Sequence, residues 1–397
     1  MGFALQLFTN AASRFIYMFL LGMLNNSSPS YSNPHATLLA NATGLTAVFS
    51  LNAFQHYIGR KTNDTVRDLQ PYGAQFIVLA MALIIILTTL SLFAATSTEC
   101  HWLIPTLAAA IALTLPELLY TIATAQDRPW RALVLYGGQS IFFIGYGIGV
   151  SQHETLLITT LCAATPVLIV NSVLFLKLNS HTPKSSIQAG VESLGKTIRT
   201  RIGMLAASAP VIATPPALVC LLNQSSDGIP QVPQMLLFSS FVGAIVFLMG
   251  NVFQHYGRDL LAPLLKIQKH QMHARLLGLL AGMFTLSLIL TAPVELILSQ
   301  LKSNFAHEWT NNWYISAAVS ATGTVILQWY TITCVHHGNT RPVLYANLLY
   351  LVIAACMTLA SPQLGIHIFT ILAVCSFIRS TWNIIDFSKT GRTAWRT

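Results

Sequence analysis

The stretch FIVLAMALIIILTTLSLFAAT covers residues Phe76 to Thr96 and contains no charged side chain. A helix that crosses a bilayer needs about 20 apolar residues, and this stretch is long enough. Of the 397 residues in the chain, 54% are hydrophobic and only 8% are charged, against about 25% charged residues in soluble domains. Since backbone groups in lipid must satisfy one another, and the apolar segments are too long for barrel strands, the sequence predicts an all-α membrane protein.

Twelve helical spans account for the apolar segments. They are expected at 3–24, 36–57, 73–96, 102–125, 133–151, 155–176, 202–222, 234–256, 276–300, 313–335, 343–361 and 366–384. The first is interpreted as a membrane helix and not as a signal peptide, because a polar loop and a second apolar segment follow it directly. Trp102, Trp130, Trp309 and Trp313 lie near span ends, where aromatic side chains anchor helices at the membrane interface.

The basic residues predict which ends of the spans face the cytoplasm. If both termini are cytoplasmic, the outer loops contain only Lys302, and Arg14 and Arg379 lie inside spans, so 21 − 3 = 18 of the 21 basic residues face the cytoplasm. This bias follows the positive-inside rule and predicts cytoplasmic termini. It also explains the net charge of +9, so we do not expect nucleic acid as a partner.

Two sequence patterns occur twice. NAFQHY at Asn52–Tyr57 returns as NVFQHY at Asn251–Tyr256, an offset of 251 − 52 = 199 residues. YTIATAQDRPWRALVLY at Tyr120–Tyr136 returns as YTITCVHHGNTRPVLY at Tyr330–Tyr345, an offset of 330 − 120 = 210 residues. Both pairs join matching spans of two six-span halves. Because six is even, both halves enter the membrane from the same side, which predicts parallel repeats related by a pseudo-twofold axis.

The repeat defines the expected domain organisation. The N-terminal lobe covers residues 1–176 and the C-terminal lobe covers 202–384. Between them, a cytoplasmic linker at 177–201 carries apolar residues at helical spacing among basic ones, which predicts an amphipathic helix on the inner leaflet. Residues 385–397 form a cytoplasmic tail.

Each hexapeptide places three polar side chains on one helix face, because positions i, i+3 and i+4 are neighbours on a helix. These residues are Asn52, Gln55 and His56 in the first copy and Asn251, Gln254 and His255 in the second. Polar groups in a span avoid lipid, so the six residues are candidate substrate contacts facing the protein interior. The alternative interpretation is that the pattern only ends a helix at the interface, with Phe and Tyr as anchors.

The last third of the chain carries a family resemblance. The segment GNTRPVLYANLLYLVIAACMTLASPQLGIHIFTILAVCSFIRSTWNI, from Gly338 to Ile384, resembles the end of Wzx-type polysaccharide flippases of the multidrug/oligosaccharidyl-lipid/polysaccharide (MOP) exporter superfamily. The matching features are a Gly and a basic residue before span eleven, an Asn early in that span and a P-x-x-G-I turn before span twelve. They correspond to Gly338, Arg341, Asn347, Pro362, Gly365 and Ile366. Small residues often follow the turn in the family, whereas His367, Ile368 and Phe369 follow it here.

The resemblance implies a transporter of the bacterial inner membrane. Such proteins move an undecaprenyl-pyrophosphate-linked oligosaccharide from the inner to the outer leaflet, and two lobes open alternately around a central cavity. Basic residues of that cavity hold the pyrophosphate and the sugars.

Three of the charged residues that lie inside spans are candidates for this chemistry. A charge in mid-membrane costs about 2.5–3.5 kcal/mol on insertion scales, so Arg14 should face a cavity or a partner. Its planar guanidinium suits a pyrophosphate, and a structural pair with Glu117 is the alternative. Arg379 is a second candidate for substrate binding, or it extends to the inner leaflet. Glu117 is the candidate for ion coupling to H⁺ or Na⁺, because burial favours a protonated carboxyl.

Other functions receive less support. The spacing of the six cysteines fits neither a disulfide framework nor a metal site. We find no Walker loop or hydrolase triad, so neither an enzyme nor a cofactor is expected. Two alternatives stay open: an ion-coupled small-molecule exporter of the same superfamily, and a non-transporting membrane scaffold. The expected partners are the lipid-linked oligosaccharide and membrane lipids, with glycosyltransferases or a polysaccharide polymerase as further candidates.

Overall fold

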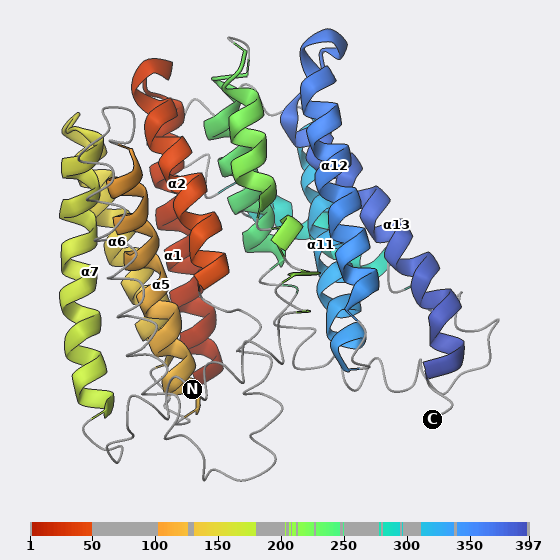
Figure 1. The fold of residues 1–397 in the computed structure, drawn as a ribbon, viewed down its shortest axis with the longest axis horizontal. Helices are drawn as coiled ribbons and strands as arrows, with labels where there is room; N and C mark the ends of the chain where they lie inside the picture. Colours follow the sequence, from red (N-terminus) through yellow and green to blue (C-terminus); the bar gives the residue numbers. More distant parts are fainter. Residues whose placement is uncertain are drawn as a thin grey trace. The chain divides into compact units, whose positions relative to one another are not determined.

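The fold is described from a computed structural model. It describes residues 2–49, 102–125, 131–179, 311–336 and 340–394, and, with gaps, 203–249 and 278–296. Within these residues every regular element is an α-helix (Figure 1). The complete helices are α1 (Gly2–Asn25), α2 (Pro29–Phe49), α5 (Leu103–Ala125), α6 (Arg131–Ser151), α7 (Leu156–Asn179), α11 (Asn311–His336), α12 (Arg341–Leu364) and α13 (Ile368–Ala394). The predicted all-α class is confirmed for this part of the chain.

Most of these helices agree with the predicted spans to within three residues at each described end. Two boundaries differ more. Helix α2 begins at Pro29, 36 − 29 = 7 residues before the predicted span, because proline is favoured in the first turn of a helix. Helix α13 continues to Ala394, 394 − 384 = 10 residues beyond the predicted span. Hydropathy marks where apolar sequence ends, and a helix continues past that point when no proline interrupts it.

The chain divides into two compact units, residues 1–216 and 217–397. The predicted span at 202–222 crosses this division, and the two predicted lobes stay a prediction. The charge-free stretch at 76–96 and the linker from residue 180 to 201 lie outside the described residues.

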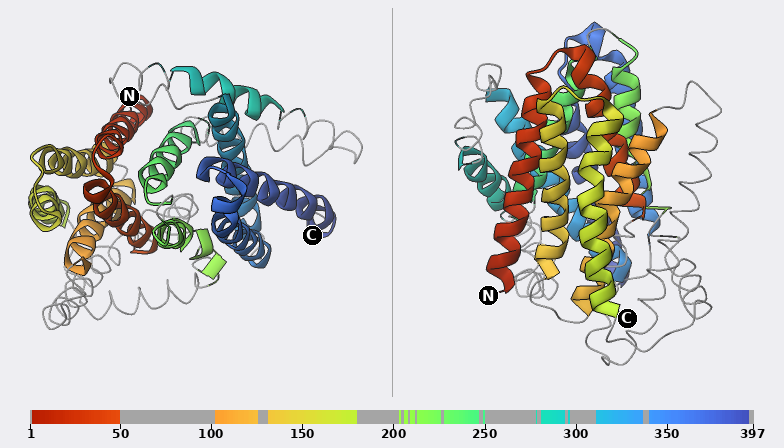
Figure 2. Two further views of the ribbon diagram at one scale, coloured as in Figure 1. Left: turned by 90° about the horizontal axis from the view of Figure 1, so that it is seen from above. Right: turned by 90° about the vertical axis from the view of Figure 1, so that its left-hand side faces the viewer.

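In the first unit, α6 lies beside α7 (Figure 2). It packs against α1, α5 and α7, while α5 also contacts α2 and α7. Glycines permit the close approach of α6 and α7: a Cβ on Gly145 would lie 3.0 Å from the Ala163 Cα, and a Cβ on Gly149 would lie 2.8 Å from the Thr159 Cγ2. Small residues at such contacts are typical of helix packing in membranes.

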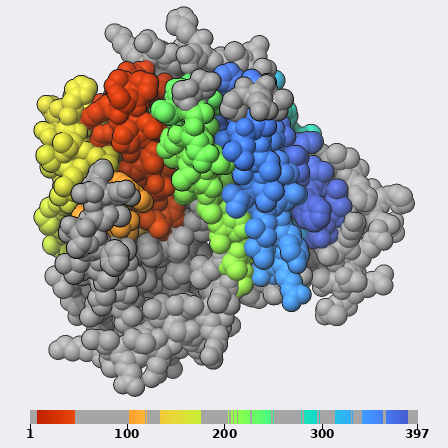
Figure 3. All heavy atoms as spheres, turned by 45° about the horizontal axis from the view of Figure 1, so that its top comes forward, coloured from red at the N-terminus to blue at the C-terminus, as the bar shows by residue number. Residues whose placement is uncertain are grey.

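The outward surface of the helices is apolar, which is expected where lipid is the solvent. On α6 and α7, exposed side chains include Ile144, Ile148, Ile169 and Val173, and α7 forms an outer surface in the space-filling view (yellow, Figure 3). Within the described residues, α6, α7, α12 and α13 are long and apolar enough to cross a membrane. The chain is therefore a multi-pass membrane protein.

In the second unit, α13 packs against both α11 and α12. A Cβ on Gly323 of α11 would lie 2.6 Å from the Ser380 Oγ and 2.9 Å from the Ser376 carbonyl oxygen. Trp313 is 4% exposed and its ring contacts Phe238 and Phe241. The expectation that Trp313 faces the membrane interface is wrong, because these aromatic partners bury it in the unit, whereas Trp102 is exposed as expected.

The turn before α13 has the form that its sequence predicts. Gly365 ends α12 in the left-handed conformation, with φ 61° and ψ 28°. Glycine adopts this conformation without the steric cost that a Cβ brings. The P-x-x-G-I pattern at residues 362–366 therefore marks a helix C-cap.

Candidate functional site

Arg14 lies on a polar face of α1. Asn10, Ser13 and Tyr17 occupy positions i−4, i−1 and i+3 relative to it, and Asn10 is only 2% exposed. The Arg14 side chain itself is partly exposed. Helix α1 is otherwise apolar, and its polar side faces the interior of the first unit.

Residues from α5 and α6 complete the cluster around Arg14. Its guanidinium interacts electrostatically with Tyr136 of α6, Tyr17 of α1 and Glu117 of α5. The structure thus brings together the two charged residues that the sequence singled out in the N-terminal half. This proximity fits both predicted interpretations, a substrate anchor beside a proton carrier and a structural pair.

A proline and a glycine allow α5 and α6 to approach each other next to Glu117. A Cβ on Gly138 would lie 2.7 Å from the Pro116 Cγ and 3.6 Å from the Asn171 Nδ2. Asn171 of α7 is 2% exposed and donates to the Val167 carbonyl oxygen at 2.7 Å, while its own Oδ1 has no hydrogen-bond partner among the residues that the structure describes. Buried polar atoms without partners are costly, so this region is suited to a polar ligand, an ion or water.

A second buried cluster lies within the second unit, around Arg379 of α13. Arg379 is 3% exposed, and its guanidinium carbon lies 4.1 Å from the centroid of the Tyr350 ring on α12. A cation–π contact of this kind is worth about 0.5–2 kcal/mol. Removing an ion from water costs several kcal/mol, so the Tyr350 ring alone does not offset the burial of Arg379.

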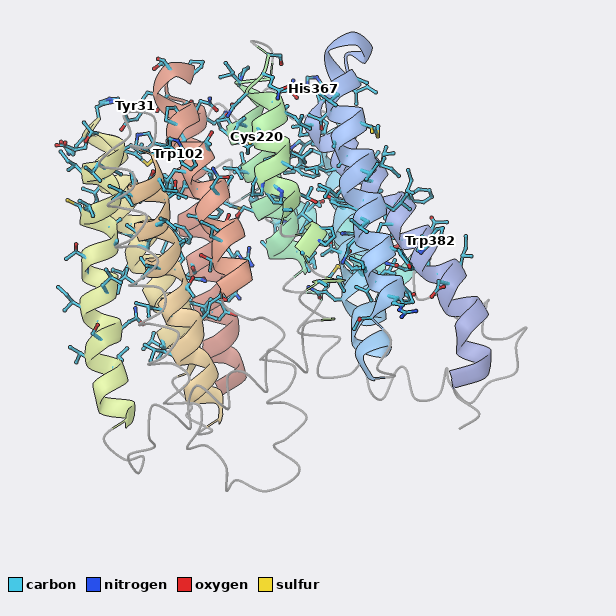
Figure 4. All side chains as sticks on the ribbon, viewed as in Figure 1. Tyr31, Trp102, Cys220, His367 and Trp382 are labelled. Atoms are coloured by element: carbon cyan, nitrogen blue, oxygen red, sulfur yellow. The ribbon has the colours of Figure 1, made fainter. Side chains whose placement is uncertain are left out.

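Polar residues follow Arg379 along one face of α13. Asn383, one turn later, is 1% exposed, and neither atom of its amide has a hydrogen-bond partner within the described residues. Asp386 accepts a hydrogen bond from the Tyr330 hydroxyl of α11. Trp382 lies on the exposed side of the same helix (Figure 4). Asn347, which belongs to the resemblance in span eleven, is also buried in this unit.

The six polar residues of the two hexapeptides lie outside the described residues. Asn52, Gln55, His56, Asn251, Gln254 and His255 therefore stay predictions, as does their equivalence in two repeats. In the part of the chain that the structure describes, no group of three metal-ligating side chains comes together.

The sequence interpretation missed a polar junction in the first unit. Tyr31, in the first turns of α2, donates to the Val150 carbonyl oxygen at 3.3 Å, and the His35 Nδ1 lies 3.0 Å from the Tyr146 hydroxyl. The Tyr31 ring, labelled in Figure 4, also contacts the rings of His35 and His153. These contacts join α2 to the end of α6. The sequence signal was two aromatic or polar residues four apart, Tyr31 and His35, which share a helix face.

Comparison with known proteins identifies the fold. No family model matches the sequence, and no curated protein sequence matches it either. Among solved structures, a MATE transporter crystallised with MaL6 matches with a TM-score of 0.52 at 12% identity, covering 99% of this chain and 98% of that one. A multidrug resistance MATE family transporter of the MOP superfamily matches in its outward-facing conformation with a TM-score of 0.51 at 12% identity, covering 98% and 95%. Its inward-facing conformation matches with the same TM-score and identity, covering 96% of each chain.

At this identity the similarity defines the fold alone. The chain shares the fold of MATE transporters of the MOP superfamily, in which twelve helices form two lobes. This is the superfamily to which the sequence resemblance pointed, although the resemblance named its polysaccharide flippase branch.

Proposed function

We propose that this protein flips an undecaprenyl-pyrophosphate-linked oligosaccharide from the inner to the outer leaflet of the bacterial plasma membrane, for surface polysaccharide assembly. It does so by alternating access, with both termini in the cytoplasm. The observation that carries the proposal is the position of Arg14, half-way along a membrane helix and partly exposed beside Tyr17, Tyr136 and Glu117. A guanidinium donates two parallel hydrogen bonds to a phosphate, which suits it to a pyrophosphate group.

Glu117 is the proposed ion-coupling residue. Its carboxylate and the substrate pyrophosphate compete for the same guanidinium, because Glu117 already interacts with Arg14. Binding of H⁺ or Na⁺ at Glu117 weakens that interaction and favours the substrate. The polar residues of the two hexapeptides complete the proposed substrate-binding set. Glycosyltransferases or a polysaccharide polymerase are the proposed protein partners, with membrane lipids around the spans.

Gene deletion tests the function. Without the protein, lipid-linked oligosaccharide is expected to accumulate on the inner leaflet and surface polysaccharide to disappear. Re-expression of the wild-type chain restores both. If deletion leaves the leaflet distribution of the lipid-linked oligosaccharide unchanged, the flippase proposal is wrong.

An ion-coupled exporter of small molecules is the second candidate. The position of Glu117 inside the apolar helix α5, beside Arg14, supports it, because a carboxylate in an apolar helix suits cationic substrates. Under this alternative, deletion raises the sensitivity of the cell to small toxic cations and does not alter surface polysaccharide. The third possibility is a membrane scaffold. In that case, vesicles that contain the purified protein transport neither the lipid-linked oligosaccharide nor small cations.

Cysteine labelling tests the proposed membrane orientation. Cysteines introduced at Ser225 and Asn311, at the predicted outer ends of spans, should react with a membrane-impermeant reagent from outside. Cysteines at Ser186 and Thr393 should react only after the membrane is permeabilised. The reverse pattern would overturn the orientation, together with the assignment of inner and outer leaflets.

A further inference from the structure

Arg379 and Asn383 form a cluster that is rich in hydrogen-bond donors and buried within a single unit. They lie one turn apart on α13, 3% and 1% exposed respectively. The Nε of Arg379 and both amide atoms of Asn383 have no hydrogen-bond partner within the described residues. The nearby Ser380 hydroxyl is already used, since it donates to the Ser376 carbonyl oxygen at 2.6 Å.

The positive charge of Arg379 also lacks a carboxylate in ion-pair contact among the described residues. Asp386 lies seven residues further along α13, which is about 10 Å along a helix axis, and its carboxylate accepts a hydrogen bond from Tyr330. At that distance it offsets little of the cost of burying a guanidinium. A charge of this kind is stable in the interior only when a negative group neutralises it or when water reaches it.

We propose that Arg379 and Asn383 bind a small inorganic anion such as chloride inside the second unit. The pair supplies a positive charge and N–H donors, and the Arg379 Nε and the Asn383 Nδ2 have no hydrogen-bond partner among the described residues, which is the chemistry of an anion site. Its burial restricts the ligand to a small one, because a sugar or a lipid headgroup reaches these residues only if α12 and α13 separate. This site goes beyond the transport function, since it stabilises the unit whether or not substrate is present.

The test measures thermal unfolding of the purified full-length protein in nanodiscs of zwitterionic lipid. Sodium chloride is titrated against sodium gluconate at constant ionic strength. Chloride is expected to raise the melting temperature in a saturable manner by about 3–5 °C. Arg379→Gln should abolish this rise, whereas Arg341→Gln, which changes an exposed arginine of the same unit, should retain it.

Asn383→Asp provides a second and stricter variant. It places a carboxylate of the same shape one turn from the guanidinium. This variant should be as stable in gluconate as the wild-type protein is in chloride, and chloride should add nothing. If Arg379 matters only for the packing of α13, Asn383→Asp is not expected to raise the melting temperature in gluconate.

Other outcomes would overturn the proposal. Equal melting temperatures in chloride and gluconate would mean that water alone solvates the cluster. A chloride effect that persists in Arg379→Gln would place the anion elsewhere. Stabilisation by added undecaprenyl pyrophosphate but not by chloride would assign Arg379 to the transported lipid. The deletion phenotype described above is independent of all three results, so the anion site and the flippase function fail separately.

Discussion

Replacing Arg14 with alanine is expected to reduce flipping of the lipid-linked oligosaccharide by about tenfold to a hundredfold, while the protein still inserts normally. The size follows from the loss of hydrogen bonds to a charged group, worth about 1.5–3 kcal/mol. Arg14→Lys keeps the charge but loses the planar fork, so it should retain part of the activity. The measurement is leaflet-specific labelling of the oligosaccharide in reconstituted vesicles.

Phe19→Ala serves as the control on the same helix, because Phe19 is an exposed apolar residue of α1. It should leave the rate unchanged. If Arg14→Ala instead lowers the amount of folded protein, and the remaining protein transports normally, Arg14 has a structural role. In that case the interaction with Glu117 is a structural pair, and the double change Arg14→Ala with Glu117→Ala should recover part of the lost protein.

Replacing Gly323 with valine is expected to lower the melting temperature of the protein by about 5 °C or more, because overpacking costs about 1–3 kcal/mol. A Cβ at this position would lie 2.9 Å from the Ser376 carbonyl oxygen, which belongs to the backbone of α13 and cannot rotate away. Helices α11 and α13 must therefore move apart. Thermal unfolding in nanodiscs, followed by tryptophan fluorescence, measures the change.

Gly282→Val is the matched control in the same unit. A Cβ on Gly282 would have no heavy atom of the described residues within 4 Å, so valine there has room. This variant should unfold within about 1 °C of the wild-type protein, since surface changes rarely exceed 0.5 kcal/mol. If Gly323→Val unfolds at the same temperature as Gly282→Val, the close α11–α13 contact does not contribute to stability.

Hydropathy was enough to predict where the described helices lie, although only α6, α7, α12 and α13 among them are long and apolar enough to cross a membrane. It could not predict their neighbours. The burial of Trp313 depends on Phe238 and Phe241, which are more than 70 residues away in the sequence. Nor did hydropathy single out the partners of the charged residues: Tyr136 near Arg14 and Tyr350 over Arg379 look like ordinary interfacial or core tyrosines in the sequence.

The sequence singles out the charged candidates of the two clusters but not the buried amides beside them. Arg14, Glu117 and Arg379 were found because a charge inside an apolar span is rare and costly. Asn10, Asn171 and Asn383 are uncharged, and a single Asn hardly lowers the hydropathy of a span. Their importance follows from the folded chain, in which each has a buried amide atom without a hydrogen-bond partner among the described residues.

The glycines of α6 have a mechanical consequence. Gly145 and Gly149 bring the backbone of α6 close to α7. At these contacts no long side chain lies between the two helices and could change rotamer to let them slide. Sliding or tilting one past the other would require backbone atoms to collide. Helices α6 and α7 are therefore expected to move together as one rigid body. Any bending that accompanies a change of conformation then occurs in other helices.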